Sequence, residues 1–230
     1  MNQSQRLLRP VLWLIPCLLL IGHLLPWASH KTAPLTLSAN DLGFFTNFTP
    51  GAGIFLNEWF YLPVWVAAVL LSVIGYRLLP LNRLLVTAFG LGVASLGLPR
   101  YEQLIKFIRT PGLALRQSEF KLQLLLTLLV MALMASAFLA SLNQQRARQI
   151  FKMPLAWPVD WSVVGLVLAA LLCLVPLAGY LSIKPYIAEL YRDAVGIGIG
   201  WWLTALADLV LWAAVFATIR LARSTHRTTH

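Results

Sequence analysis

Long runs of apolar residues alternate with short polar segments along the whole chain. Five runs are clear, at 11–25, 59–76, 122–142, 162–183 and 201–219. A sixth, at 79–98, is rich in glycine and carries Asn82 and Arg83 near one end. Each run is close to the ~20 residues that a helix needs to cross the hydrocarbon layer of a bilayer. The pattern predicts an all-α polytopic integral membrane protein of about six transmembrane helices, with residues 1–230 forming one helical-bundle domain.

A short motif occurs twice, each time just before an apolar run. A helix-breaking Pro-Gly pair is followed at the same spacing by an acid and an aromatic: Pro50, Gly51, Glu58 and Trp59 in one copy, Pro111, Gly112, Glu119 and Phe120 in the other. This order is typical of an interfacial turn that leads into a membrane helix, with the two glutamates at headgroup level. Two copies on one face require an even number of crossings between them. The run at 79–98 is therefore counted as a span, which favours six spans over five.

Positive charges orient these spans only weakly. With six spans, one face holds ten lysines and arginines, including three after the last span, and the other face holds eight. The rule that loops rich in Lys and Arg stay inside, together with the repeated motif, predicts that both termini are cytoplasmic. The protein is expected in a plasma or inner membrane.

The first apolar run has a second interpretation. Arg6 and Arg9 before it, and its short length, would also fit a secretory signal peptide. The flank at 27–31 makes a poor small-x-small cleavage site, however, and Trp27 suits an interfacial anchor. A retained first span is favoured, and cleavage stays open as the alternative.

The loops on the outer face carry amphipathic patterns. Within a helix predicted over 101–109, Tyr101, Leu104, Ile105 and Ile108 recur with helical spacing, while polar residues occupy the other side. Similar patterns occur at 38–48, after a candidate cap at Ser38 or Asn40, and at 184–194, before a glycine-rich break at 196–200. These patterns predict short amphipathic interfacial helices, with the glycines as a flexible entry to the last span.

Small residues recur every fourth position in two of the spans. Such stripes let helix backbones approach closely, so they predict helix packing. The stripes are Ala132, Ser136 and Ala140 in one span and Gly165, Ala169 and Cys173 in the next. Cys173 is therefore interpreted as a packing residue and not as a nucleophile.

Composition agrees with the membrane class and narrows the partners. Hydrophobic residues make up 59% of the chain and charged residues 11%, with a net charge of +10. The basic residues lie in clusters between apolar runs, where they are expected to contact anionic lipid headgroups and not nucleic acid. Both cysteines fall inside apolar runs, and no motif for a metal site, a cofactor or a catalytic residue is present, so no metal ion and no cofactor are predicted.

Two ionisable residues fall inside predicted spans. Asp208 is seven residues past Trp201, or ~10 Å below the outer boundary, and His23 is four residues before Trp27, or ~6 Å below it. An ionisable group at such depth is a candidate functional residue, although a hydrogen bond between helices is the plainer explanation. Because the two depths are similar, His23 and Asp208 are expected to pair if the terminal spans are neighbours.

Three functions fit these features. A non-catalytic subunit or scaffold that assembles with other membrane proteins is favoured, because no cluster of residues indicates a reaction. A small transporter or channel that uses Asp208, with His23, for proton or ion coupling is the first alternative. A membrane enzyme or haem carrier that uses His23 or the outer carboxylates is the second, weakened because only one histidine lies in the spans.

Overall fold

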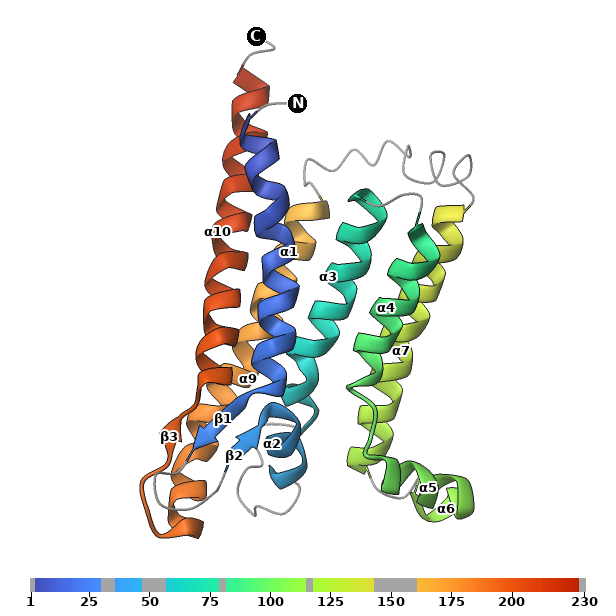
Figure 1. The fold of residues 1–230 in the computed structure, drawn as a ribbon, viewed down its shortest axis with the longest axis vertical. Helices are drawn as coiled ribbons and strands as arrows, with labels where there is room; N and C mark the ends of the chain where they lie inside the picture. The colour runs from blue at the N-terminus through green and yellow to red at the C-terminus, as the bar shows by residue number, and fades with distance from the viewer. Residues whose placement is uncertain are drawn as a thin grey trace.

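The computed structural model describes residues 3–29, 36–46, 57–78, 82–114, 118–142 and 161–227, and it is mostly helical (Figure 1). The helices that run along the bundle are α1 (Gln3–Leu24), α3 (Leu62–Leu78), α4 (Arg83–Ser95), α7 (Ser118–Leu142), α9 (Trp161–Tyr191) and α10 (Ile199–Arg227). Helix α1 begins and α10 ends at the same end of the bundle, here called the terminal end. The opposite end is called the loop end.

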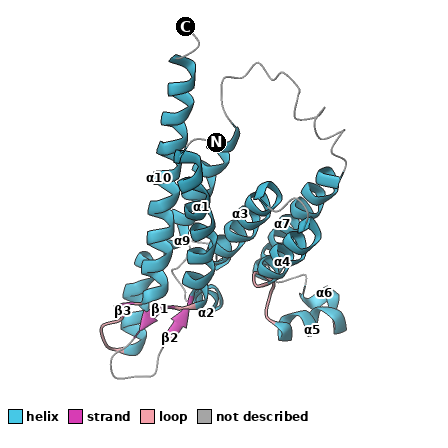
Figure 2. Ribbon diagram, turned by 45° about the horizontal axis from the view of Figure 1, so that its top comes forward, coloured by secondary structure: helices cyan, strands magenta, loops and turns pink. Residues whose placement is uncertain are grey.

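Short elements gather at the loop end (Figures 1 and 2). They are the helices α2 (Ala39–Phe45), α5 (Tyr101–Arg109) and α6 (Pro111–Ala114), the 3₁₀ helix η2 (Asn57–Tyr61), and the strands β1 (Pro26–Ser29), β2 (Thr36–Ser38) and β3 (Gly196–Ile197). Helix α4 runs back alongside α3, so the chain reaches α5 and α6 at the same end as α2.

Four helices are long and apolar enough to cross a membrane, which confirms the membrane class. Their apolar stretches are Glu58–Tyr76, Phe120–Leu139, Val163–Tyr191 and Ile199–Arg220. The other two predicted spans appear as α1, whose described apolar part is Trp13–Leu24, and as the shorter apolar helix α4, Arg83–Ser95. Helix α4 has 13 residues and rises only ~20 Å, against the ~30 Å of a hydrocarbon core. The prediction of six spans is therefore confirmed only in part.

The main core of the bundle is built around α3, which contacts α1, α4, α7 and α9. Ile15 and Leu19 of α1, Val64 of α3, and Leu211 of α10 are almost completely buried in this core. Helices α1 and α10 are in extensive contact, so the two terminal helices are neighbours. Because α1 supplies side chains to the centre of the core, the first apolar run forms a helix of the bundle.

A small antiparallel sheet of order β2-β1-β3 closes the loop end (Figure 2). Ala28 pairs with Leu37 on one side and with Ile197 on the other. This sheet corrects two expectations, that the fold is all-α and that 196–200 is a flexible entry to the last span. The Gly198 amide donates a hydrogen bond to the Trp27 carbonyl at 2.6 Å, so this segment is a paired strand that joins the first and last helices.

A second core lies beneath the sheet. Trp27 is fully buried there, and its ring meets the rings of Phe60 and Tyr180 edge-on at 6.0 and 6.1 Å between centroids. The Trp27 indole nitrogen donates a 2.7 Å hydrogen bond to the Gly22 carbonyl. The aromatic residue that the sequence assigned to an interfacial anchor is thus a central packing residue.

The predicted loop helices differ in outcome. Helix α5 has the predicted bounds, and α2 begins after an N-cap at Ser38, whose side chain forms a reciprocal capping box with Asp41. The third predicted loop helix is wrong as a separate element, because α9 continues through Pro185 to Tyr191. Ile187 is fully buried in the second core, and this contact holds the extension of α9 in place.

Candidate functional site

His23 lies at the loop end of α1, where it is 1% exposed. Its ring stands 6.0 Å from the Tyr61 ring, tilted by 49°, and it hydrogen-bonds to the backbone of Phe60. Its Nδ1 has no partner among the described residues. His23 therefore faces η2 and the start of α3.

Polar side chains from four further elements converge near His23. Asp41 of α2 forms a 3.0 Å salt bridge with Arg100, whose guanidinium also lies 4.1 Å from the centre of the Phe44 ring. Gln123 of α7 lies near the Tyr61 side chain and donates to the Gly97 carbonyl at 3.1 Å. We call His23, Asp41, Tyr61, Arg100 and Gln123 the loop-end cluster. It brings together α1, α2, η2, α7 and the α4–α5 connection, and only His23 among its members was expected from the sequence to be a candidate site residue.

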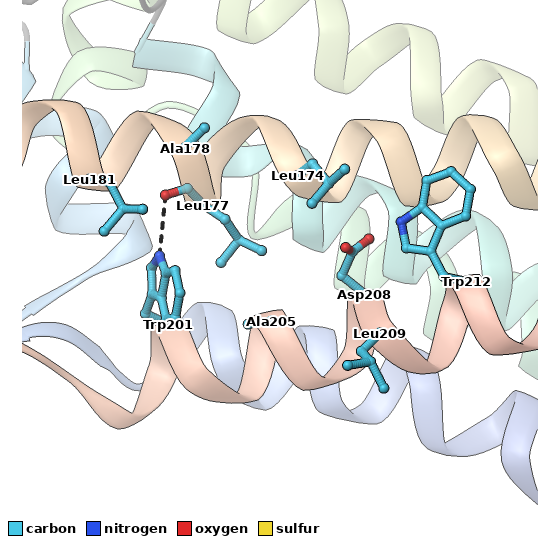
Figure 3. Close-up of a pocket in the computed structure, with 9 residues that line it drawn as sticks. All are labelled: Leu174, Leu177, Ala178, Leu181, Trp201, Ala205, Asp208, Leu209 and Trp212. Carbon is cyan, nitrogen blue, oxygen red and sulfur yellow. Dashed lines mark hydrogen bonds between the residues drawn. The ribbon is translucent and has the colours of Figure 1, made fainter.

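Asp208 lies in α10 and is 5% exposed. Helices α9 and α10 form a groove of about 520 Å³ around it (Figure 3). The lining residues of this Asp208 groove are Leu174, Leu177, Ala178, Leu181, Trp201, Ala205, Asp208, Leu209 and Trp212. On each helix they recur with helical spacing, so each helix contributes one continuous face.

The polar groups of the groove are few. The Trp201 indole donates to the Leu177 carbonyl at 3.2 Å, which links α10 to α9. The Trp212 indole nitrogen is turned toward the Asp208 carboxylate (Figure 3). The second oxygen, Oδ1 of Asp208, is buried and has no partner among the described residues.

The expected pair of His23 and Asp208 does not form, although α1 and α10 are neighbours. His23 faces Phe60 and Tyr61, whereas Asp208 faces α9. The reason is rotational: Asp208 shares its face of α10 with Trp212 and Ala205, and this face turns toward α9. Similar depth in two adjacent helices was not enough to predict contact.

The two copies of the Pro-Gly motif take different structures. Pro50 and Gly51 lie outside the described residues. Pro111 and Gly112 are exposed in α6, while Phe120 is buried against Phe107 with 5.5 Å between ring centroids. Glu119 is part of α7, and Trp59 is half-buried in η2.

Glu58 differs most from its expected position at headgroup level. It lies in η2 and is 3% exposed. Helix η2 packs against α2, α7 and α9. Glu58 is therefore a buried residue of the fold in this structure.

The two small-residue stripes also differ. In α9, Ala169 and Cys173 are buried in the main core, whereas Gly165 has open space around it. In α7, Ala132 and Ser136 are exposed, and the side chain of Ala140 lies outside the described residues. Among the described residues, the α7 stripe therefore does not pack against another helix.

No three His, Cys, Asp or Glu side chains in the described ranges lie close enough together to hold a metal ion. The chain matches no family model, no curated protein and no solved structure. Its function must therefore be argued from its own residues.

Proposed function

We propose that this protein is a non-catalytic integral membrane subunit or scaffold that binds another membrane protein through the outward face of α7. The observation that carries the proposal is the exposure of α7. Only 11% of its apolar stretch is buried, against 67% for that of α3. This helix therefore offers most of its surface to lipid or to a partner.

The outward face of α7 has the composition of a helix-docking surface. Met134 is 2% exposed and points into the bundle, and Ala132 and Ser136 are each two residues away, about 200° around the helix. They therefore lie opposite the packed side. A groove of small residues flanked by leucines allows a second transmembrane helix to approach closely, which stabilises association where no water drives it.

The docking surface can be blocked without touching the core. In the double variant Ala132→Leu/Ser136→Leu, bulk is added on the exposed stripe, so we expect at least a tenfold loss of the copurifying partner, or about 1.4 kcal/mol of binding energy. The measurement is quantitative mass spectrometry of the tagged protein purified from native membranes.

Ala137→Leu is the matched control, because Ala137 is also exposed but lies about 100° around the helix from Ser136. It should retain the partner at the wild-type level. If the double variant and the control keep equal amounts of partner, or if the wild-type protein carries none, the proposed assembly is refuted.

The proposal includes a six-span arrangement in a plasma or inner membrane, with the terminal end cytoplasmic. Supporting this arrangement, α1 and α4 lie alongside the four helices that are long and apolar enough to cross a membrane, and α1 begins at the end of the bundle where α10 ends. In this arrangement α5 lies at the outer interface, where its exposed Tyr101, Ile105 and Ile108 meet lipid. The Lys and Arg clusters contact anionic headgroups.

Reporter fusions test this topology. Fusions after Arg223 and within 143–158 are both expected to report a cytoplasmic position, because both sites follow helices that end at the terminal end. A fusion after Arg109 should report the outside and serves as the internal control. An outside signal from both of the first two fusions would contradict the six-span arrangement.

A small transporter or channel remains the second candidate, favoured by the buried Asp208. In that case, Asp208→Asn would give a folded protein without proton-coupled or ion-coupled activity in liposomes. The groove opens between α9 and α10 and not along the main core, which is built from apolar side chains. For this reason the subunit role is preferred.

A further inference from the structure

The Asp208 groove lies on the outer surface of the bundle. Leu174, Leu181 and Leu209 line it and are 41%, 48% and 65% exposed, so its mouth faces the surroundings of the helices. Trp201 and Trp212 stand at its two ends, 11 residues apart on α10, which is ~16 Å. Its volume of about 520 Å³ falls within the range of sites that bind small molecules.

Asp208 supplies the only ionisable side chain among the nine lining residues. Its Oδ1 is buried without a partner in the described part of the chain. The Trp201 indole N–H already donates to the Leu177 carbonyl. A molecule that enters the groove can therefore supply the hydrogen bond that Oδ1 of Asp208 lacks.

Packing does not account for an acid at this position. No hydrogen bond joins the Asp208 side chain to the residues of α9 that line the groove (Figure 3). The groove around it is aliphatic and aromatic, and a leucine would suit this environment better than a carboxyl group. Burying a carboxyl group that has an oxygen without a hydrogen-bond partner costs stability. Such a group indicates that a ligand binds there.

We infer that the Asp208 groove binds a membrane-soluble amphiphile that has a long apolar body and one hydrogen-bond donor, either a hydroxyl or an ammonium group. The apolar body lies between α9 and α10 and contacts the two tryptophans. The donor bonds to Oδ1 of Asp208. The molecule enters sideways from the bilayer through the exposed leucines.

This site is independent of the partner surface proposed for α7. Helices α10 and α7 lie at opposite edges of the bundle (Figure 1). Loss of a protein partner would therefore leave the groove intact, and loss of the ligand would leave the partner bound. The two proposals can fail separately.

Photolabelling of the full chain in phospholipid nanodiscs tests the inference. The probes are a diazirine-bearing long-chain primary amine, the alcohol with the same chain, and the methyl ether with the same chain as the control head group. We expect the amine and the alcohol to label residues 174–181 and 201–212 at least about tenfold more than the ether, because only they donate to Asp208.

Three variants test whether the labelling comes from the groove and depends on Asp208. Ala178→Phe fills the groove and should abolish labelling, whereas Ala213→Phe adds the same bulk at an exposed position of α10 outside it and should not. Asp208→Leu should remove the preference for the donor head groups and have a thermal midpoint no lower than that of the wild type.

Three results would overturn the inference. Equal labelling by the three probes would mean that the groove holds bulk lipid only. Labelling of Ala178→Phe at the wild-type level would place the ligand elsewhere. A loss of folded protein in Asp208→Leu would show that the acid serves the fold.

Discussion

Replacing Trp27 by alanine is expected to lower the free energy of unfolding by about 3–5 kcal/mol, the range for deleting a large buried aromatic. Trp27 is fully buried, meets Phe60 and Tyr180 edge-on, and donates to the Gly22 carbonyl at 2.7 Å. Its loss leaves a cavity beneath the sheet and an unpaired acceptor in α1. The measurement is equilibrium unfolding of the detergent-purified protein, followed by circular dichroism.

Trp202→Ala is the matched control for this prediction. Trp202 is 58% exposed, so its removal should change the unfolding free energy by no more than about 0.5 kcal/mol. If the two variants were equally stable, the packing of Trp27 in the second core would not stabilise the loop end. Trp27 would then be no more than an interfacial residue, as its place in the sequence first suggested.

Gly200→Ala is expected to destabilise the protein by about 3 kcal/mol, at the upper end of the range for overpacking. A Cβ at this position would meet the carbonyl oxygen of Leu25, would lie 2.6 Å from that of Gly22, and would crowd the Trp27 ring. Backbone atoms cannot rotate away as a side chain can, so α10 and the end of α1 would have to separate. Thermal unfolding of the detergent-purified variant measures the effect.

Gly165→Ala is the control, since Gly165 also lies inside a helix but has nothing within 4 Å of its missing Cβ. The same substitution there should be neutral or stabilise α9 by up to about 1 kcal/mol, because alanine favours a helix more than glycine does. Equal destabilisation by both changes would show that the close approach of α1 and α10 does not matter for stability.

The candidate sites show what the depth and spacing of residues along the sequence can predict, and what they cannot. Sequence positions placed Asp208 and His23 inside apolar helices, and both are buried. The sequence could not give their direction, because a helix presents a new face every 100° and the faces that turn inward depend on the neighbours. Thus His23 joined the loop-end cluster, Asp208 joined the α9–α10 groove, and the expected pair did not form.

By itself, the sequence determined the membrane class, most of the apolar helices and the bounds of α5, and it narrowed the cap of α2 to Ser38 or Asn40, of which Ser38 is used. These features are local: each depends on hydropathy, periodicity or a side chain within a few residues. Only the tertiary structure decided that 196–197 forms a strand with β1, that Trp27 and Glu58 are buried, and that the α7 stripe faces outward while Ala169 and Cys173 pack inside. These features depend on segments up to about 180 residues apart, as with Gly22 and Gly200, and no local pattern specifies which surfaces meet across that separation.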